Sequence, residues 1–467
     1  MKFENKISRR QFVRLTGVAA LGGATLAACA APAARPAAPA AGATAAAPAA
    51  GAATTEAPAA AAAGSLTVWG SGLDLTQIEK APTAQGAALI AHREAFLAKH
   101  PGTTIVWEDQ GWDEALRQNI VTALLGGTQP DVIVGENFFQ QYAALNALLP
   151  IDDVLTPEVL DNSIVGTHKA ALYNGKHYGL SWISGCFGFE ANPNVLEAAG
   201  VDPKIPATWT ELLAAAETVN KGGKAAGYTL QGPLGFSVGG MFRLAVYMQQ
   251  SGTTLNQADD PFKPNFDDPK SFPVWEFVRK INALTPPGLT FEADEGKVYS
   301  QLWAGKSAFQ MAGSWHVNGA KEAGLKNALY GPVPIPEGGK AASYVVGNVI
   351  YGALSATKVP ELALDWIIAS QDKTVQDIVF KSAGRLPSTK SSIELLQKDS
   401  AVDDATKQFA TLLKDSDLGI LPQWNKEPNK LNATWNDLFT AVLTTQTDVA
   451  SLAADAQKKA LEIVTAA

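Results

Sequence analysis

LTVWG at residues 66–70, TTIVW at 103–107 and DVIV at 131–134 are three short runs dominated by apolar, β-branched and aromatic residues, which is typical of buried strands. Residues 87–99 and 114–125 lie between these runs and carry apolar side chains at helical spacing. Strands that alternate with helices in this order favour a parallel sheet covered by helices. The sequence therefore predicts an α/β protein.

The residues that follow these strands are the first place to expect a binding site. In open parallel sheets, ligands bind in the crevice beyond the carboxyl ends of the strands. Residues 69–74 lie at and just after the end of the first predicted strand, and residues 135–137 follow the third. The candidate contacts in these two segments are Trp69, Asp74, Glu136 and Asn137.

Length, charge and cysteine content limit the class of protein. The chain has 467 residues, which is enough for two or three domains, and 46% of them are hydrophobic. Its formal net charge is -8 and it contains no basic run, so nucleic acid is not an expected partner. The two cysteines are Cys29 and Cys186. Cys186 stands in an apolar run and is expected to be a small buried residue without a disulfide partner in the folded body.

A helix start can be identified at residues 206–213, PATWTELL. Thr208 is a candidate cap, and Glu211 three residues later completes a capping-box pattern. Trp209 is expected to pack in the core. The tryptophans with the same expected role are Trp112, Trp275, Trp303 and Trp366.

The amino terminus has the parts of an export signal. Residues 1–14 are basic, residues 15–28 are small and apolar, and Cys29 follows. The sequence LAAC ending at Cys29 resembles the lipobox of bacterial lipoproteins, in which the cysteine is acylated. SRRQFVR at residues 8–14 resembles the twin-arginine export motif, and the alternative is an ordinary basic start for the general secretory route. We expect residues 1–29 to be a lipoprotein signal peptide.

Residues 30–64 consist almost entirely of Ala, Pro, Gly and Thr, and prolines interrupt every potential helix. This composition predicts a disordered linker with an average span of about 30–35 Å. No later stretch is apolar for the roughly 18 residues that a membrane span needs. The sequence thus predicts a folded body tethered to the outer face of the cytoplasmic membrane through Cys29.

Several segments between residues 96 and 366 carry a resemblance to a known family in the same order along the chain. The chain resembles the bacterial extracellular solute-binding proteins of the family that includes the maltodextrin-binding protein. The segments are FLAKHPG at 96–102, GGTQPDVI at 126–133, NGKHYGL at 174–180, Asn192 with LEAAGV at 196–201 and ATWTEL at 207–212, GKSAFQMAGSW at 305–315 and PELALDW at 360–366. The family has a tyrosine before Asn192, where this chain has Ala191.

The resemblance implies a periplasmic-binding-protein type II fold, in which two α/β lobes, each with a mixed and mainly parallel sheet, are joined by a hinge. Lobe one would comprise residues 65–183 and 334–384, and lobe two residues 184–333 and 385–467. The hinge would lie near Ser184, Val333 and Arg385.

The resemblance also implies a function. Such proteins bind a small solute between their lobes and deliver it to the permease subunits of an ABC importer. A binding protein of this kind is a monomer, is not an enzyme, and needs no cofactor or metal. A sugar is the expected solute, and a polyol or a glycerol phosphodiester is the alternative.

Eleven tryptophans agree with a sugar site, because indole rings can cover the apolar faces of sugars while polar side chains bind the hydroxyl groups. Trp315 falls on the tryptophan of the family's Gly-x-Trp element, and Trp435 aligns with a stacking tryptophan near the carboxyl end. The expected ligand contacts are Trp69, Asp74, Glu136, Asn137, Trp182, Trp315, Asn348 and Trp435. For each tryptophan the alternative is hydrophobic packing.

One motif suggests an enzyme instead. GFSVG at residues 235–239 matches the nucleophile elbow of α/β-hydrolases, with Ser237 as nucleophile and His316 as the one histidine downstream. The preceding segment contains Gln231, Gly232 and Pro233 rather than a strong strand, which argues against an elbow. The five histidines also lack metal-ligand spacing. A binding protein is therefore favoured over a serine hydrolase.

Overall fold

The computed structural model describes most of the chain beyond the expected linker. The chain divides into two units, residues 1–59 and residues 60–467, and the described residues all belong to the second. The expected signal peptide, Cys29 and residues 30–63 lie outside the described residues. The described residues are 64–70, 84–111, 113–135, 139–164, 167, 171–232, 239–257, 260, 263–292, 294–340, 343–345, 349–379, 385–415, 417–419 and 427–466.

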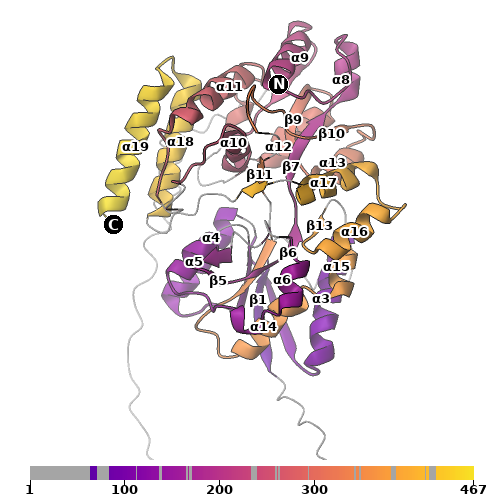
Figure 1. The fold of residues 1–467 in the computed structure, drawn as a ribbon, viewed down its shortest axis with the longest axis vertical. Helices are drawn as coiled ribbons and strands as arrows, with labels where there is room; N and C mark the ends of the chain where they lie inside the picture. Colours follow the sequence, from indigo (N-terminus) through magenta and orange to yellow (C-terminus); the bar gives the residue numbers. More distant parts are fainter. Residues whose placement is uncertain are drawn as a thin grey trace, which may run out of the picture. The chain divides into compact units, whose positions relative to one another are not determined.

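The larger of two main sheets contains the strands predicted at residues 66–70, 103–107 and 131–134 (Figure 1). In order across the sheet, its strands are β13 (Leu386–Pro387), β6 (Leu180–Ser184), β12 (Val349–Ala353), β3 (Val132–Gly135), β1 (Ser65–Gly70) and β2 (Thr104–Asp109). Strand β1 pairs in parallel with β2 and β3, whereas β12 and β13 pair antiparallel. The predicted parallel arrangement at the amino-terminal end is confirmed.

Helices cover both faces of this sheet because side chains alternate between faces along each strand. On one face, Val68 packs with residues of α3 (Ala84–Lys99) and α14 (Pro360–Ala369). On the other face, Trp69 packs with residues of α4 (Asp113–Gly126) and α5 (Phe139–Ala144). The helices expected at residues 87–99 and 114–125 are confirmed as α3 and α4.

The smaller main sheet is mixed and has its own core. Its strand order is β10 (Leu329–Gly331), β7 (Phe187–Ala191), β9 (Ser307–Gly313) and β8 (Ala226–Thr229), with only β8 and β9 parallel. The helices whose buried residues share this core include α9 (Trp209–Lys221), α10 (Gly239–Gln250), α11 (Phe272–Ala283), α17 (Asp404–Asp415), α18 (Pro428–Thr444) and α19 (Val449–Ala466). Each sheet thus forms a mixed α/β layer structure. The expectation that each sheet is mainly parallel is wrong, because antiparallel pairings outnumber parallel ones in both sheets.

Helix α9 begins where its capping residues predict. The Thr208 hydroxyl oxygen accepts a hydrogen bond of 3.2 Å from the backbone N–H of Glu211. The Glu211 carboxylate accepts one of 2.9 Å from the backbone N–H of Ala207. Trp209 stacks on Phe277 with the ring centroids 4.1 Å apart, which confirms its packing role.

The chain passes between the two sheets more than once. It leaves β6 at Ser184 and enters β7 at Phe187, so Gly185 and Cys186 form the first crossing. It returns between β10 and β12. Strand β13 still pairs with β6, so the larger sheet extends past residue 384, where the sequence placed the end of lobe one.

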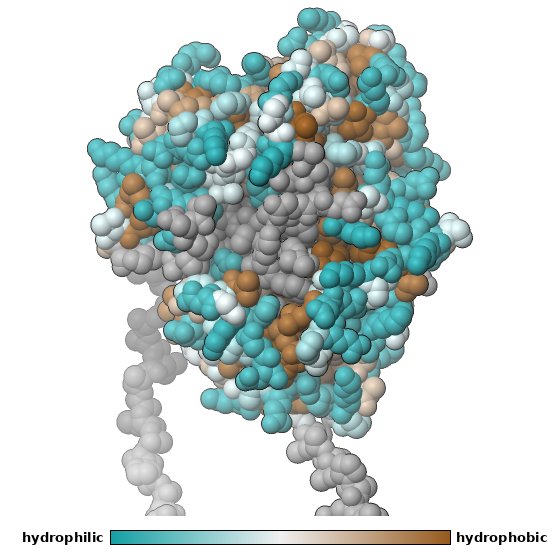
Figure 2. All heavy atoms as spheres, in the orientation of Figure 1, coloured by the Kyte–Doolittle hydropathy of each residue, from teal (hydrophilic) through white to brown (hydrophobic). Residues whose placement is uncertain are grey.

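The remaining elements are η1 (Asp152–Val154), α6 (Pro157–Asn162), β4 (Leu172–Tyr173), β5 (Lys176–His177), α8 (Pro193–Ala198), η3 (Pro269–Ser271), η4 (Leu289–Phe291), α12 (Glu295–Trp303), α13 (His316–Glu322), β11 (Ser343–Val345), α15 (Lys373–Val379), α16 (Lys390–Lys398) and β14 (Asp417–Gly419). Within the part of the chain that the structure describes, no helix has both the length and the apolar character required to cross a membrane. Figure 2 shows mainly hydrophilic residues on the drawn face, with hydrophobic residues in separate patches between them.

Candidate functional site

Trp69 lies near the carboxyl end of β1, where the first candidate site was expected. It pairs with Glu108 of β2, and its indole Nε1 donates a hydrogen bond of 2.9 Å to Glu108 Oε2. Trp69 is 9% exposed, because its ring packs among residues of α4 and α5. The next residue must be glycine, since a Cβ at Gly70 would lie 2.2 Å from the Trp107 ring. Gly70 thus leaves room for the Trp107 ring, and the hydrogen bond to Glu108 holds the Trp69 indole.

A chain of polar side chains continues from this tryptophan along the same edge. Gln110 Nε2 donates to Glu108 Oε2 over 3.3 Å, and Asn119 Nδ2 of α4 donates to Gln110 Oε1 over 3.0 Å. Glu108 is exposed. None of these three residues was predicted as a site residue from the sequence. For Glu108 and Gln110, a signal that could have found them is their position at the end of the second strand, because parallel neighbours end at one edge of the sheet.

Trp315 lies directly after β9, at the start of α13, and is only partly buried. Its ring stands edge-to-face with Phe187 at a centroid distance of 5.4 Å. The Arg385 guanidinium carbon lies 5.9 Å from the centroid of the indole. A Cβ on Gly185 would approach the Trp315 ring to 3.0 Å. Trp315 therefore contacts the first crossing and Arg385, which precedes β13.

A buried carboxylate lies beside the next residue, His316. Glu190 of β7 is fully buried, and it accepts hydrogen bonds from Trp303 Nε1 (3.0 Å), Tyr330 OH (3.1 Å) and Gln310 Nε2 (2.6 Å). His316 Nδ1 is 3.7 Å from Glu190 Oε2. Burial and the adjacent Glu190 carboxylate raise the pKa of Tyr330. This network fixes the elements around the end of β9.

Trp182 and Trp435 are deeply buried, at 2% and 0% exposure. Trp182 packs in the core of the larger sheet, 5.5 Å from the Tyr351 ring. Trp435 packs against Trp275 of α11, with centroids 5.0 Å apart. Their surroundings favour hydrophobic packing, which was the alternative for each, and ligand contact by either residue stays a prediction.

Several expected site residues cannot be placed. Asp74, Glu136, Asn137, Asn348 and the alternative nucleophile Ser237 all lie outside the described residues. Trp69 and Trp315 are thus the described candidates whose rings lie at the ends of strands. Among the described residues, no group of three or more His, Cys, Asp or Glu side chains could hold a metal ion.

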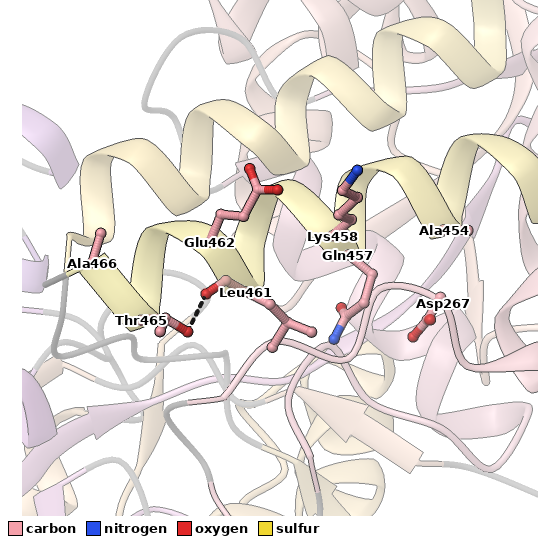
Figure 3. Close-up of a pocket in the computed structure, with 8 residues that line it drawn as sticks. All are labelled: Asp267, Ala454, Gln457, Lys458, Leu461, Glu462, Thr465 and Ala466. Carbon is pink, nitrogen blue, oxygen red and sulfur yellow. Dashed lines mark hydrogen bonds between the residues drawn. The ribbon is translucent and has the colours of Figure 1, made fainter.

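Cys186 and two pockets along α19 offer no aromatic ring at a strand end. Cys186 is fully buried, its thiol donates to the Phe409 carbonyl over 3.3 Å, and burial raises the pKa of the thiol. A pocket of about 630 Å³ lies along α19 (Figure 3). Its lining residues are Asp267, Ala454, Gln457, Lys458, Leu461, Glu462, Thr465 and Ala466. This lining has no aromatic side chain and includes no strand end.

The family model and the known relatives that this chain matches all describe binding proteins. The model of the bacterial extracellular solute-binding protein family matches residues 80–377. A Brucella abortus protein named as a binding protein is 26% identical over 348 residues, which cover 72% of this chain and 80% of the relative. An uncharacterized ABC transporter extracellular-binding protein of Pyrococcus horikoshii is 22% identical over 359 residues, covering 75% and 77%.

Solved structures share the fold. The GacH receptor of Streptomyces glaucescens, solved unliganded and with acarbose, superimposes with a TM-score of 0.69 at 18% identity, covering 86% of this chain and 99% of that one. Lmo0181 of Listeria monocytogenes in complex with cycloalternan gives a TM-score of 0.70 at 16% identity, with the same coverage. The fold is therefore the two-lobed type expected from the sequence. Since the family match spans well over half of the chain, this protein belongs to the bacterial extracellular solute-binding proteins, which bind solutes and are not enzymes.

Proposed function

We propose that this chain is the solute receptor of an ABC importer and that its solute is a carbohydrate. The observation that carries the proposal is the presence of an aromatic residue at a strand end of each main sheet, Trp69 near the carboxyl end of β1 and Trp315 after β9. The solved relatives support the solute class, since they include proteins bound to acarbose, cycloalternan and maltose. The Pyrococcus relative supports the transporter class.

The chemistry of sugars suits this arrangement. An indole ring covers the apolar C–H face of a pyranose, while a few polar groups fix its hydroxyl groups. We assign the aromatic contacts to Trp69 and Trp315. The proposed polar contacts are Asp74, Glu136, Asn137 and Asn348.

Binding would close the two lobes about their crossing segments, so that the permease can distinguish the loaded receptor from the empty one. The proposed lobe boundaries are those expected from the sequence, with the third hinge displaced beyond Pro387, because β13 pairs within the larger sheet. The receptor would act as a monomer.

We further propose that Cys29 is lipidated after export by the twin-arginine route, and that residues 30–64 tether the receptor to the outer face of the cytoplasmic membrane. Replacement of Cys29 by Ser should release the full-length protein from the membrane fraction into the medium. Retention of the Cys29→Ser protein in that fraction would contradict the anchor and leave the binding function untouched.

A thermal-shift titration with mono- and oligosaccharides tests the solute class. A ligand at 100 times its Kd should stabilise the native state by about 2.7 kcal/mol, and above Kd the unfolding temperature should keep rising with the logarithm of the ligand concentration. Stabilisation by polyols or glycerol phosphodiesters, with none by sugars, would overturn the carbohydrate assignment. Turnover of a bound ligand that disappears in Ser237→Ala would overturn the receptor role.

A further inference from the structure

We propose that Glu108 is a specificity residue of the solute site. Its carboxylate accepts hydrogen bonds from solute hydroxyl groups and disfavours solutes that carry a carboxylate or phosphate. This inference rests on the proposed function, because it assumes that the solute lies at the carboxyl edge of β1 and β2. Beyond the proposed function, it assigns the site a selectivity for uncharged solutes that are rich in hydroxyl groups.

The sheet register places Glu108 at this edge. Strands β1 and β2 are parallel, and Trp69 pairs directly with Glu108 near the carboxyl end of both. Paired residues of neighbouring strands point to the same face of a sheet. Glu108 is exposed, whereas the Trp69 ring is almost fully covered. The carboxylate is therefore the more accessible member of this pair.

The hydrogen bonds of Glu108 leave part of its capacity for a ligand. A carboxylate accepts only, and its two oxygens offer about four acceptor sites. In the described part of the chain, Trp69 Nε1 and Gln110 Nε2 both donate to Oε2. These two hydrogen bonds thus hold the Glu108 side chain in place through Oε2. The other oxygen can accept from a solute hydroxyl group.

Within the described ranges, the carboxylate of Glu108 has no ion-pair partner among Lys, Arg or His. Its two recorded donors, an indole and an amide, are neutral. A carboxylate or phosphate that approached Oε1 would meet a fixed negative charge, and salt would screen that repulsion because the site is exposed.

The simpler role for Glu108 is to hold Trp69 in place. Glu108→Gln separates the two roles, because glutamine keeps a carbonyl oxygen that can accept from Trp69 Nε1 and loses the charge. Glu108→Ala removes both. The matched control is Glu197→Gln on α8, which makes the same change at an exposed position in the other sheet's layer.

The experiment is calorimetric titration of the four proteins with the neutral sugar that stabilises the wild type best and with its uronic acid counterpart. We expect Glu108→Gln to bind the neutral sugar about tenfold more weakly, the factor given by a 1.4 kcal/mol difference. Its preference for the neutral sugar over the acid should also shrink, most clearly at low salt. Glu197→Gln should match the wild type, and the unfolding temperature of Glu108→Gln should be unchanged.

If Glu108→Gln binds both sugars as the wild type does, and only Glu108→Ala loses affinity, then Glu108 merely positions Trp69 and the inference is overturned. The proposed function would survive that result. If the wild type itself binds no sugar, the proposed function fails and the inference fails with it, so the two failures are distinguishable.

Discussion

Trp315 is the residue beside the smaller sheet to which we assign a solute contact. Its ring is partly exposed and rests against Gly313 and Gly185. Trp315→Ala should weaken binding of the best sugar by about thirtyfold, since a lost aromatic anchor costs on the order of 2 kcal/mol. Trp315→Phe should keep a larger part of the affinity. Calorimetric titration checks both, and equal affinity of wild type and Trp315→Ala would exclude a contact.

Glu190 is a residue whose role is stability rather than binding. Glu190→Ala would leave three donors, those of Trp303, Tyr330 and Gln310, without their acceptor. Since a buried unpaired donor costs about 1–3 kcal/mol and some donors will relax, we expect the free energy of unfolding to fall by about 3 kcal/mol. Urea unfolding measures it.

Glu190→Gln provides the control at the same position. Trp303 and Tyr330 both donate to Oε1, which glutamine retains, and the Gln310 amide can turn over to accept from the new N–H. The glutamine variant should therefore lose less than about 1 kcal/mol. A large loss in both variants would show that the charge itself, and not the hydrogen bonds, matters.

At the scale of elements, His92 couples the packing of α3 on α14 to pH. It is fully buried, with Nε2 2.8 Å from the Trp366 carbonyl. Burial, opposed by that hydrogen bond, lowers the pKa of His92 from 6.5 to about 4. The unfolded chain therefore binds a proton below pH 6.5 that the native state does not accept until about pH 4. Stability should fall across this window as pH decreases, by up to about 3 kcal/mol from this residue.

The contribution of His92 is measured by comparing urea unfolding of wild type and His92→Phe at several values between pH 7 and pH 4.5. Phenylalanine loses the bond to Trp366 and should lower stability at neutral pH, but its free energy of unfolding should depend less on pH. Carboxylates common to both proteins cancel in the difference. Parallel pH profiles would contradict a neutral buried histidine.

At the scale of the whole molecule, we expect the first crossing, Gly185 and Cys186, to link solute binding to closure of the two lobes. A Cβ at residue 185 would lie 3.0 Å from the Trp315 ring and 3.1 Å from Ser314 Oγ, so Gly185→Ala requires a small shift of that ring. We expect affinity to fall about tenfold with little change in unfolding temperature, because the displacement affects the site rather than a core. Gly126→Ala, whose Cβ would meet only Thr128 Oγ1 at 3.6 Å, is the control. Equal binding by both variants would exclude the link.

The sequence predicted the parts of the fold that depend on periodicity. Strands β1, β2 and β3 and helices α3 and α4 follow from local patterns that packing does not reverse. Strand β13 was not anticipated, because two residues, Leu386 and Pro387, carry no periodic signal. The role of Glu108 also could not be read locally, since its proximity to Trp69 depends on which strands are neighbours.

The sequence alone could not decide whether a given tryptophan packs in a core or contacts a solute. Trp182 and Trp435 lie in cores and Trp315 is partly exposed, and the residues beside them in the sequence do not reveal this difference. A large ring suits both a hydrophobic core and a sugar platform, so its neighbours in space decide between these roles. Those neighbours are set by long-range packing.

Cys186 has a practical consequence. It is fully buried within the first crossing, and burial raises the pKa of its thiol, so alkylating reagents should reach it only when that segment opens locally. Because Cys186→Ser would remove the target, it gives the blank for such labelling. The alkylation rate of the mature protein then reports the frequency of opening at one defined point of the backbone, and a bound solute that holds the lobes together should slow it.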